Sequence, residues 1–146
     1  MAASGDRRIL SDSPARTMQI GERIGRELRA GDVVLLHGEL GAGKTCFVRG
    51  LARGMGIDPR AVSSPTFVLI NEYDGAPGTP RLLHMDAYRL DGPDDLDGLT
   101  LDDALSDAAM VVEWAERVLE GMPDPTLDIA FRHVGDEQRE LTVRAP

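Results

Sequence analysis

The sequence predicts an α/β fold with three layers, in which helices cover a mixed, mainly parallel sheet. Residues 33–37 are a continuous apolar run, as expected of a strand buried on both faces of a parallel sheet. A glycine-rich turn follows over residues 38–45, and a helical stretch follows the turn. Strand-like segments then alternate with turns to the C-terminus. With 146 residues, the chain fits a single domain spanning residues 1–146.

The first elements are a short strand and a helix. Residues 7–10 favour a strand, and the segment 1–8 is expected to be flexible. Ser13 and Pro14 are typical of a helix N-cap followed by proline at the first helical position. The helix is expected to continue to about Ala30, with its apolar face supplied by Met18, Ile20, Ile24 and Leu28.

A second helix is expected from the glycine-rich turn to about Met55. Residues 67–73 then favour a strand, and the glycines and prolines of 74–81 favour a turn. A third strand over 82–87 could pair with the second as a hairpin. The remaining expected elements are a helix over 94–108 that ends near Asp107, a strand over 110–112 with Glu113 and Trp114 at its carboxyl end, and closing strands over 127–131 and 140–144.

Charge and composition restrict the possible partners and compartment. The net charge of −9 disfavours direct binding of nucleic acid, which usually needs a basic patch. An aspartate-rich stretch over 91–107 contains no basic residue and is either a solvated surface or a docking surface for a partner. With only Cys46, no internal disulfide can form, and no apolar run approaches the ~20 residues of a membrane-spanning helix. We therefore expect a cytoplasmic protein.

Residues Gly38 to Thr45 match the pattern G-x-x-x-x-G-K-[ST], which binds nucleotide phosphates. Its glycines let successive backbone N–H groups turn toward phosphate oxygens, and the following helix directs its positive end at the same anion. Lys44 is the only lysine of the chain, beside fifteen arginines. The predicted fold is therefore P-loop NTPase-like, with ATP and Mg²⁺ as cofactors. The loop residues expected to contact the nucleotide are Glu39, Leu40, Gly41, Ala42, Gly43, Lys44, Thr45 and Cys46.

Two acidic residues follow predicted strands and could serve the metal and the attacking water. The Thr45 hydroxyl is expected to bind Mg²⁺. Either Asp86 or Glu113 could hold the metal, while the other orients or activates water, and spacing does not decide between them. Thr66, in the segment Ser-Pro-Thr, could belong to a switch that orders around the γ-phosphate, or it could lie in an ordinary turn. Cys46 is interpreted as a small buried apolar residue and not as a redox switch.

The sequence resembles the TsaE (YjeE) family of bacterial ATPases over about residues 9–145. Four motifs in order carry the resemblance: Gly-Glu-Leu-Gly-Ala-Gly-Lys-Thr (38–45), Ser-Ser-Pro-Thr-Phe (63–67), His-Met-Asp-Ala-Tyr-Arg-Leu (84–90) and Val-Glu-Trp (112–114). Two positions depart from the usual pattern. Ala115 stands where the family commonly has proline, and Cys46 stands where Thr or Ser is frequent.

The resemblance implies an ATPase of threonylcarbamoyladenosine synthesis on tRNA. Its partners would be the TsaD and TsaB proteins, and tRNA would be reached only through that complex, which ATP hydrolysis resets. The resemblance makes Asp86 and Thr66 catalytic residues and places Glu113 on the metal side and Trp114 beside the nucleotide. A module that binds ATP without useful turnover is the main alternative. A small-molecule kinase is disfavoured because no arginine-dense lid is present. A GTPase is disfavoured because the chain has no second lysine for the guanine-reading motif.

Overall fold

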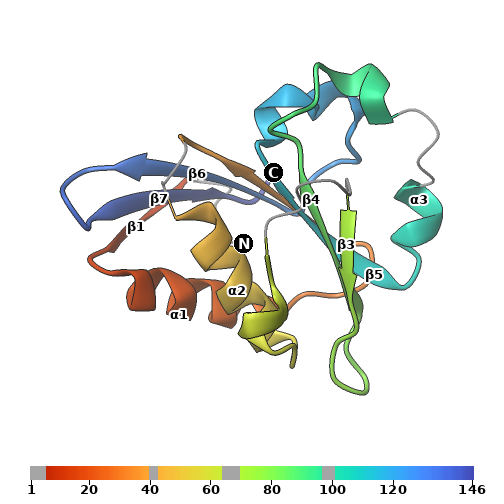
Figure 1. Cartoon of the computed structure of the whole chain (residues 1–146), viewed down its shortest axis with the longest axis horizontal. Helices are drawn as coiled ribbons and strands as arrows, with labels where there is room; N and C mark the ends of the chain where they lie inside the picture. The colour runs from red at the N-terminus through yellow and green to blue at the C-terminus, as the bar shows by residue number, and fades with distance from the viewer. Residues whose placement is uncertain (1–5, 40–42, 64–69, 97–100) are drawn as a thin grey trace.

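The computed structural model describes residues 6–39, 43–63, 70–96 and 101–146. Across these ranges seven strands form one sheet in the order β1-β7-β6-β2-β5-β4-β3 (Figure 1). The strands are β1 (Arg7–Ser11), β2 (Val33–His37), β3 (Ile70–Tyr73), β4 (Arg81–Asp86), β5 (Ala108–Glu113), β6 (Leu127–His133) and β7 (Arg139–Arg144). The sheet thus joins strands from both ends of the chain.

The centre of the sheet is parallel and its margins are antiparallel. Strands β6, β2, β5 and β4 pair in parallel. At one side β7 pairs antiparallel with β6 and β1, and at the other side β3 pairs antiparallel with β4. Only β3 and β7 therefore run against the common direction. This confirms the expected mixed, mainly parallel sheet, including the hairpin of β3 and β4 and the closing pair β6 and β7.

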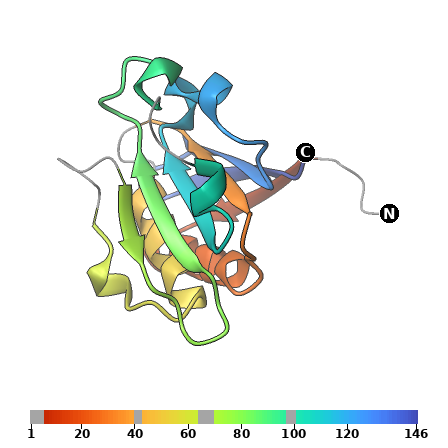
Figure 2. The same cartoon turned by 90° about the vertical axis from the view of Figure 1, so that its right-hand side faces the viewer.

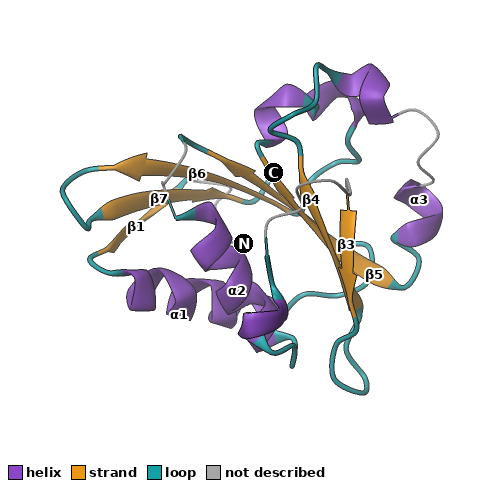
Figure 3. Cartoon of the chain, in the orientation of Figure 1, coloured by secondary structure: helices purple, strands orange, loops and turns teal. Residues whose placement is uncertain are grey.

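Helices of unequal length cover the two faces (Figures 2 and 3). The longer ones are α1 (Pro14–Gly25) and α2 (Lys44–Gly54). The remaining ones are α3 (Leu101–Ala104) and the 3₁₀ helices η1 (Pro59–Ala61), η2 (Pro93–Leu96), η3 (Ala115–Arg117) and η4 (Leu119–Gly121). None of the helices in the described ranges is both long and apolar enough to cross a bilayer.

The core has two parts, one on each face of the sheet, because successive strand residues point to opposite sides. On the face covered by α1 and α2, Val34 and Leu36 of β2 pack with Phe47 and Leu51 of α2. On the other face, Val33 and Leu35 pack with side chains that include Leu96, Leu105 and Val118 from the shorter helices and turns. The predicted three-layer arrangement is therefore present.

Glycines hold α1 and α2 at close range. A Cβ atom at Gly21 would overlap the Phe47 carbonyl oxygen of α2, and one at Gly50 would overlap the Met18 carbonyl oxygen of α1. Each helix also has a second such glycine one turn further on, at Gly25 and Gly54. The two backbones therefore touch, and α1 is packed directly against the helix that follows the glycine-rich loop.

The structure corrects two expectations about the helices. The first helix ends at Gly25 instead of about Ala30, because the chain tightens into three-residue turns in which Glu27 N–H bonds the Ile24 carbonyl and Leu28 N–H bonds the Gly25 carbonyl. The helix expected over 94–108 is described as η2 and α3, with 97–100 outside the described ranges. It ends at Ala104 instead of near Asp107, and Ala108 already belongs to β5, whose buried apolar residues favour the sheet.

At two strands the boundaries differ from those expected. The strand expected over 67–73 is described from Ile70, since 67–69 lie outside the described ranges. The flexible segment expected over 1–8 overlaps β1, because Arg7 and Arg8 pair with Val143 and Thr142 of β7.

Candidate functional site

The candidate site lies at the edge of the sheet where β2, β4 and β5 end. Since these strands are parallel, their carboxyl ends meet at the same edge, the usual place for ligand sites in open α/β sheets. Asp86 ends β4 and Glu113 ends β5, and the two are register partners on neighbouring strands. Both expected carboxylates are thus side by side, next to the loop that follows His37.

The described part of the glycine-rich loop has the backbone shape that its glycines allow. Gly43, the N-cap of α2, has φ of 96°. Gly38 has φ of 143°, and a Cβ there would lie 2.7 Å from the Phe131 carbonyl oxygen. Other residues would be strained or would clash at these positions. Glu39 is exposed. Leu40, Gly41 and Ala42 fall outside the described ranges, so their contacts stay predictions.

Lys44 is buried at the start of α2, with 4% of its surface exposed. Its Nζ donates to the Gly38 carbonyl oxygen at 2.5 Å and lies 3.5 Å from the centre of the Trp114 ring. Burial lowers the pKa of Lys44, and the negative charges of Glu116, Glu113 and Asp86 oppose that shift. Its ammonium is thus held over the loop by a carbonyl and an aromatic face.

A buried chain of hydrogen bonds joins α2 to two strands. The Thr45 hydroxyl donates to Glu113 Oε1 at 3.1 Å. The second oxygen of that carboxylate, Oε2, lies 2.6 Å from Nε2 of His84, which is fully buried in β4. Both carboxylate oxygens of Glu113 are thereby fixed, and its side chain is oriented toward the first turn of α2. The expected pairing of Thr45 with a strand-end carboxylate is present for Glu113.

Sequence reasoning gave His84 no role of its own, although this residue begins the motif at 84–90. The signal that could have found it is the two-residue period of a strand. His84 and Asp86 are two apart in β4, so both face the side of the sheet where α2 lies, as Leu82 does. A polar residue at a position that should be buried in a central strand is the feature to look for.

Asp86 has a different environment from Glu113. Its side chain is half-buried, and Oδ1 accepts a hydrogen bond from the Tyr88 backbone N–H at 2.9 Å. Burial raises the pKa of Asp86. The Tyr88 N–H opposes the shift, and the nearby negative charge of Glu113 adds to it. The structure therefore distinguishes the two carboxylates, one held by side chains on both oxygens and one with a raised proton affinity.

Aromatic side chains cover the site beside Lys44. Trp114 has φ of 58°, a left-handed conformation that is uncommon outside glycine. Its ring centre lies 4.8 Å from that of Tyr88, and the Arg117 guanidinium lies 5.5 Å from the Tyr88 ring. Ala115, where the family commonly has proline, is buried and begins η3. The backbone thus turns sharply at Trp114 and directs its indole onto Lys44.

A pocket of about 380 Å³ adjoins the loop on the side of α1. Its lining residues come from α1 and its N-cap, the end of the loop and the start of α2, and the β6–β7 turn with the start of β7: Ser13, Pro14, Thr17, Gly43, Cys46, Asp136, Glu137 and Arg139. The Cys46 thiol is half-buried, donates to the Pro14 carbonyl oxygen at 3.2 Å, and has its pKa raised by burial. These properties fit a packing thiol and not a reactive one.

Within the described ranges, no cluster of three or more His, Cys, Asp or Glu side chains forms a ready metal cage. A metal here would draw on the Thr45 hydroxyl and on carboxylates from Asp86 and Glu113. Thr66 lies outside the described residues, so its expected role stays a prediction.

Comparison with known proteins gives one family. The profile of the family described as Threonylcarbamoyl adenosine biosynthesis protein TsaE matches residues 11–141. The chain belongs to the TsaE family. It is 45% identical to the tRNA threonylcarbamoyladenosine biosynthesis protein TsaE of Streptomyces coelicolor over 130 residues, which cover 86% of this chain and 87% of that protein.

Other TsaE-family relatives agree with this assignment. The protein of the same name from Bacillus subtilis is 40% identical over 134 residues, which cover 91% of this chain and 82% of that protein. The crystal structure of Bacillus subtilis YdiB superposes with a TM-score of 0.77 at 34% identity, covering 97% of this chain and 86% of that one. The family resemblance and the P-loop fold predicted from the sequence are both confirmed.

Proposed function

We propose that this TsaE-family chain binds and hydrolyses ATP with Mg²⁺ and thereby supports threonylcarbamoyl transfer to adenosine in tRNA. One observation carries the proposal: the Thr45 hydroxyl of the loop helix and the Glu113 carboxylate of β5 are 3.1 Å apart. That pairing of a P-loop hydroxyl with a strand-end carboxylate is how such proteins prepare a magnesium site. The names of the relatives, which are tRNA threonylcarbamoyladenosine biosynthesis proteins, support the pathway.

The residues around Lys44 fit the phosphates of a nucleotide. The N–H groups at the start of α2 have no partner earlier in the helix and suit an anion, and Gly43 lets the backbone approach closely. Lys44 supplies the positive charge, and its present hydrogen bond to the Gly38 carbonyl can be exchanged for one to a phosphate oxygen. The ammonium is compact, whereas a guanidinium would not fit the buried space between Gly38 and Trp114.

The donor set at Thr45 and Glu113 fits Mg²⁺, which takes oxygen ligands and commonly keeps several waters. When bound, the ion supplies charge stabilisation for the transferred phosphoryl group. His84 holds Glu113 Oε2, so that Oε1 stays directed at the Thr45 hydroxyl. A hydroxyl and a carboxylate suffice here because the remaining ligands of such sites come from water and phosphate.

Asp86 fits the role of the residue that orients the attacking water and takes its proton. Its Oδ1 is held by the Tyr88 N–H, which leaves Oδ2 to accept a proton from water. The raised pKa of Asp86 favours that acceptance, because a general base works best when its pKa lies close to the pH at which the enzyme operates. Glu113, engaged on both oxygens, is left to the metal side.

The pocket of about 380 Å³ beside Gly43 and Cys46 is our proposed site for the base and ribose. It adjoins the phosphate loop and lies within the usual size range of small-molecule sites. We propose that the protein partners are the TsaD and TsaB proteins, whose complex ATP hydrolysis resets, and that tRNA is reached only through them. The net charge of −9 supports indirect contact with tRNA.

The test is steady-state ATP hydrolysis by the chain alone and with purified TsaD and TsaB. We expect stimulation by the pair. Glu113→Ala should lower turnover by about two orders of magnitude or more, since it removes a group that acts on the metal and holds Thr45. Glu120→Ala, which truncates an exposed glutamate on η4, is the matched control and should leave turnover unchanged.

Transfer of threonylcarbamoyl to tRNA is measured in the same mixtures. Loss of transfer with Glu113→Ala supports hydrolysis as the useful step. Full transfer by this variant, with ATP still bound, would contradict the proposal and favour a module that acts by binding alone.

A further inference from the structure

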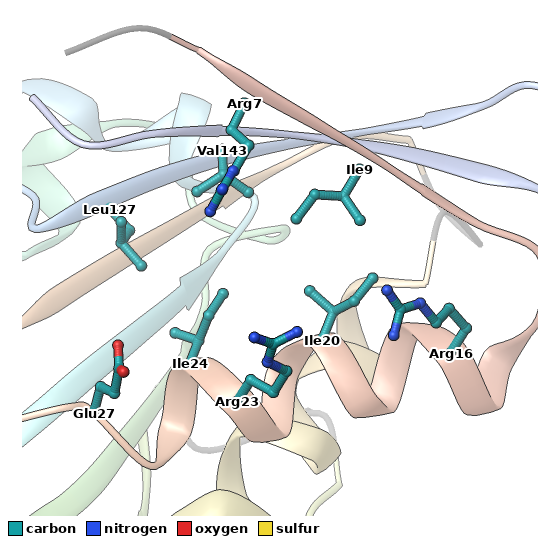
Figure 4. A pocket seen from close by; sticks show the side chains of 9 residues that line it. All are labelled: Arg7, Ile9, Arg16, Ile20, Arg23, Ile24, Glu27, Leu127 and Val143. Atoms are coloured by element: carbon teal, nitrogen blue, oxygen red, sulfur yellow. The ribbon is translucent and has the colours of Figure 1, made fainter. Parts of the chain in front are cut away.

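A second hollow lies away from the phosphate loop, between α1 and the sheet (Figure 4). We call it the arginine groove. Its volume is about 320 Å³, and it is lined by Arg7, Ile9, Arg16, Ile20, Arg23, Ile24, Glu27, Leu127 and Val143. Leu127 is the register partner of Val34 near the beginning of β2, whereas the phosphate loop follows the end of that strand. The groove therefore follows α1 toward the opposite edge of the sheet.

The groove combines an apolar floor with basic walls. Ile9, Ile24, Leu127 and Val143 are only partly buried, although they pack against the main core. Arg16 and Arg23 project from α1, and Arg7 projects from β1 toward them (Figure 4). Covering the floor would remove apolar surface from water, which is favourable.

The three arginines have no ion-pair partner in the described part of the chain, although acidic residues outnumber basic ones by nine. Some arginines outside the groove are paired, as Arg53 is with Glu22, Arg81 with Asp107 and Arg144 with Asp6. Among the lining residues the single carboxylate is Glu27. An excess of positive charge on this concave surface favours a ligand that carries carboxylates.

The strand beside the groove is also the free edge of the sheet. β1 pairs with β7 on one side and is last in the strand order of the described residues. Arg7 and Ile9 point to the groove, while Arg8 and Leu10 point to the other face, where Leu10 is 59% exposed. An extended peptide can add to such an edge through backbone hydrogen bonds and place alternate side chains on each face.

We propose that β1 and the arginine groove bind an extended segment of a protein partner in which acidic residues alternate with apolar ones. The backbone of that segment adds to the β1 edge. On the groove face its carboxylates meet Arg7, Arg16 and Arg23, and the methylene groups of these acidic side chains cover the apolar floor. Its apolar side chains lie on the other face, beside Leu10. The basic residues on the edge also select against basic strands, which would be repelled. This surface goes beyond the proposed ATPase and does not depend on it.

The test compares two double variants with the same change in net charge. Arg7→Glu with Arg23→Glu reverses two groove arginines. Arg29→Glu with Arg60→Glu reverses two exposed arginines outside the groove, one after α1 and one on η1. The probe is a fluorescein-labelled peptide of alternating glutamate and valine, and a lysine–valine peptide is the control. Binding is measured by fluorescence anisotropy, and the contact surface is mapped by amide NMR shifts of the wild-type chain.

We expect the acidic peptide to bind the wild type and to shift amides of β1 and α1. The groove variant should weaken binding by about tenfold or more, because two charged contacts are reversed, and the control variant by no more than about twofold. Both variants should keep the thermal stability and ATP affinity of the wild type, which separates this test from that of the ATPase.

Several outcomes would overturn the proposal. They are no binding of the acidic peptide, equal weakening by both variants, or equal binding of the lysine–valine peptide. A wild-type dimer in sedimentation that only the groove variant dissociates would assign the groove to a second copy of this chain. Competition by decanoate as strong as that by the peptide would assign it to an alkyl carboxylate.

Discussion

The two faces of the sheet are built differently, although the same strands supply both. In the described ranges the buried polar residues are Ser11, Thr17, Lys44, His84 and Glu113. All of them belong to the face covered by α1 and α2 or to those helices. The opposite face, under η2, α3, η3 and η4, is filled by apolar side chains such as Leu35, Met85 and Val112. The face under α1 and α2 therefore holds the buried polar residues of the candidate site, and the other face is an apolar core.

The difference arises from alternation along single strands. In β4, His84 and Asp86 face α2, while Leu83 and Met85 face the other way. Helix α2, which brings Lys44 and Thr45 to these residues, is held against α1 by glycines. The helix therefore has little freedom to shift relative to α1. Rigid placement of this kind supports a site in which the Thr45 hydroxyl and the Glu113 carboxylate must meet.

The largest effect is expected from the glycine contact between α1 and α2. Gly50→Ala should destabilise the fold by about 2–4 kcal/mol, because the added Cβ overlaps the Met18 carbonyl oxygen and forces the helices apart. Alanine's higher helix propensity offsets only about 1 kcal/mol. The free energy of unfolding is measured by urea denaturation.

The control for that comparison is Gly92→Ala, in the segment that leads into η2. A Cβ there meets nothing within 4 Å. Its effect should stay within about 0.5 kcal/mol. Equal losses in the two variants would contradict the close packing of α1 on α2.

The next effect concerns binding at Lys44. Lys44→Ala should weaken ATP binding by about one to two decades, the loss of a charge-assisted hydrogen bond worth roughly 1.5–3 kcal/mol. Lys44→Arg should weaken ATP binding to a similar extent, because the larger guanidinium does not fit the buried space between Gly38 and Trp114. Isothermal titration calorimetry measures the affinity. Arg53→Ala, on the exposed side of the same helix, serves as control, and wild-type affinity in Lys44→Ala would contradict the phosphate site.

A smaller effect is expected on stability from Asp86. Since burial raises the pKa of Asp86 in the folded state, the ionised form opposes folding at neutral pH, and this cost disappears as the pH falls below both its folded and unfolded pKa values. Asp86→Asn should therefore stabilise the fold at pH 7 by less than about 1 kcal/mol, because the group is only half-buried. The gain should vanish in acid.

Thermal melts of Asp86→Asn across pH, together with turnover, provide the measurement. The exposed Asp124→Asn is the control and should show no pH-dependent gain. A stabilised Asp86→Asn with lost turnover would show that this face gives up stability for activity. Destabilisation at pH 7 would contradict the assigned environment of Asp86.

The smallest effect is spectroscopic. Trp114 is the only tryptophan, and its ring contacts the Lys44 ammonium at 3.5 Å. A phosphate that draws Lys44 Nζ away should change the indole emission, and Lys44→Ala should abolish that response. Titration of ATP against intrinsic fluorescence measures it. An unchanged emission in the wild type at saturating ATP would show that Lys44 stays on Trp114.

The sequence by itself predicted the site through local patterns. The buried run of β2, the glycine-rich loop and the helix after it identified Lys44 and Thr45, because a phosphate loop is a contiguous structure. Asp86 and Glu113 were found as acids at strand ends. His84 was missed, since its role depends on contact with Glu113, 29 residues further along the chain.

Patterns were less informative where elements are short. The aspartate-rich segment favoured a helix ending near Asp107, yet α3 ends at Ala104, because the buried strand β5 begins at Ala108 and limits the room for a helix. The end of α1 was misplaced because Leu28, still buried, extended the apolar periodicity past Gly25.

The sequence thus determined the fold class, the position of the glycine-rich loop and the residue types of the candidate site, because these follow from periodicity and from contiguous motifs. Only the tertiary structure decided how the surroundings of the two carboxylates differ. Glu113 is held by Thr45 and His84, while Asp86 is half-buried with a raised pKa. It also decided that three unpaired arginines gather in one groove. Such distinctions depend on strand register and on helix packing between residues distant in the chain, which local patterns do not contain.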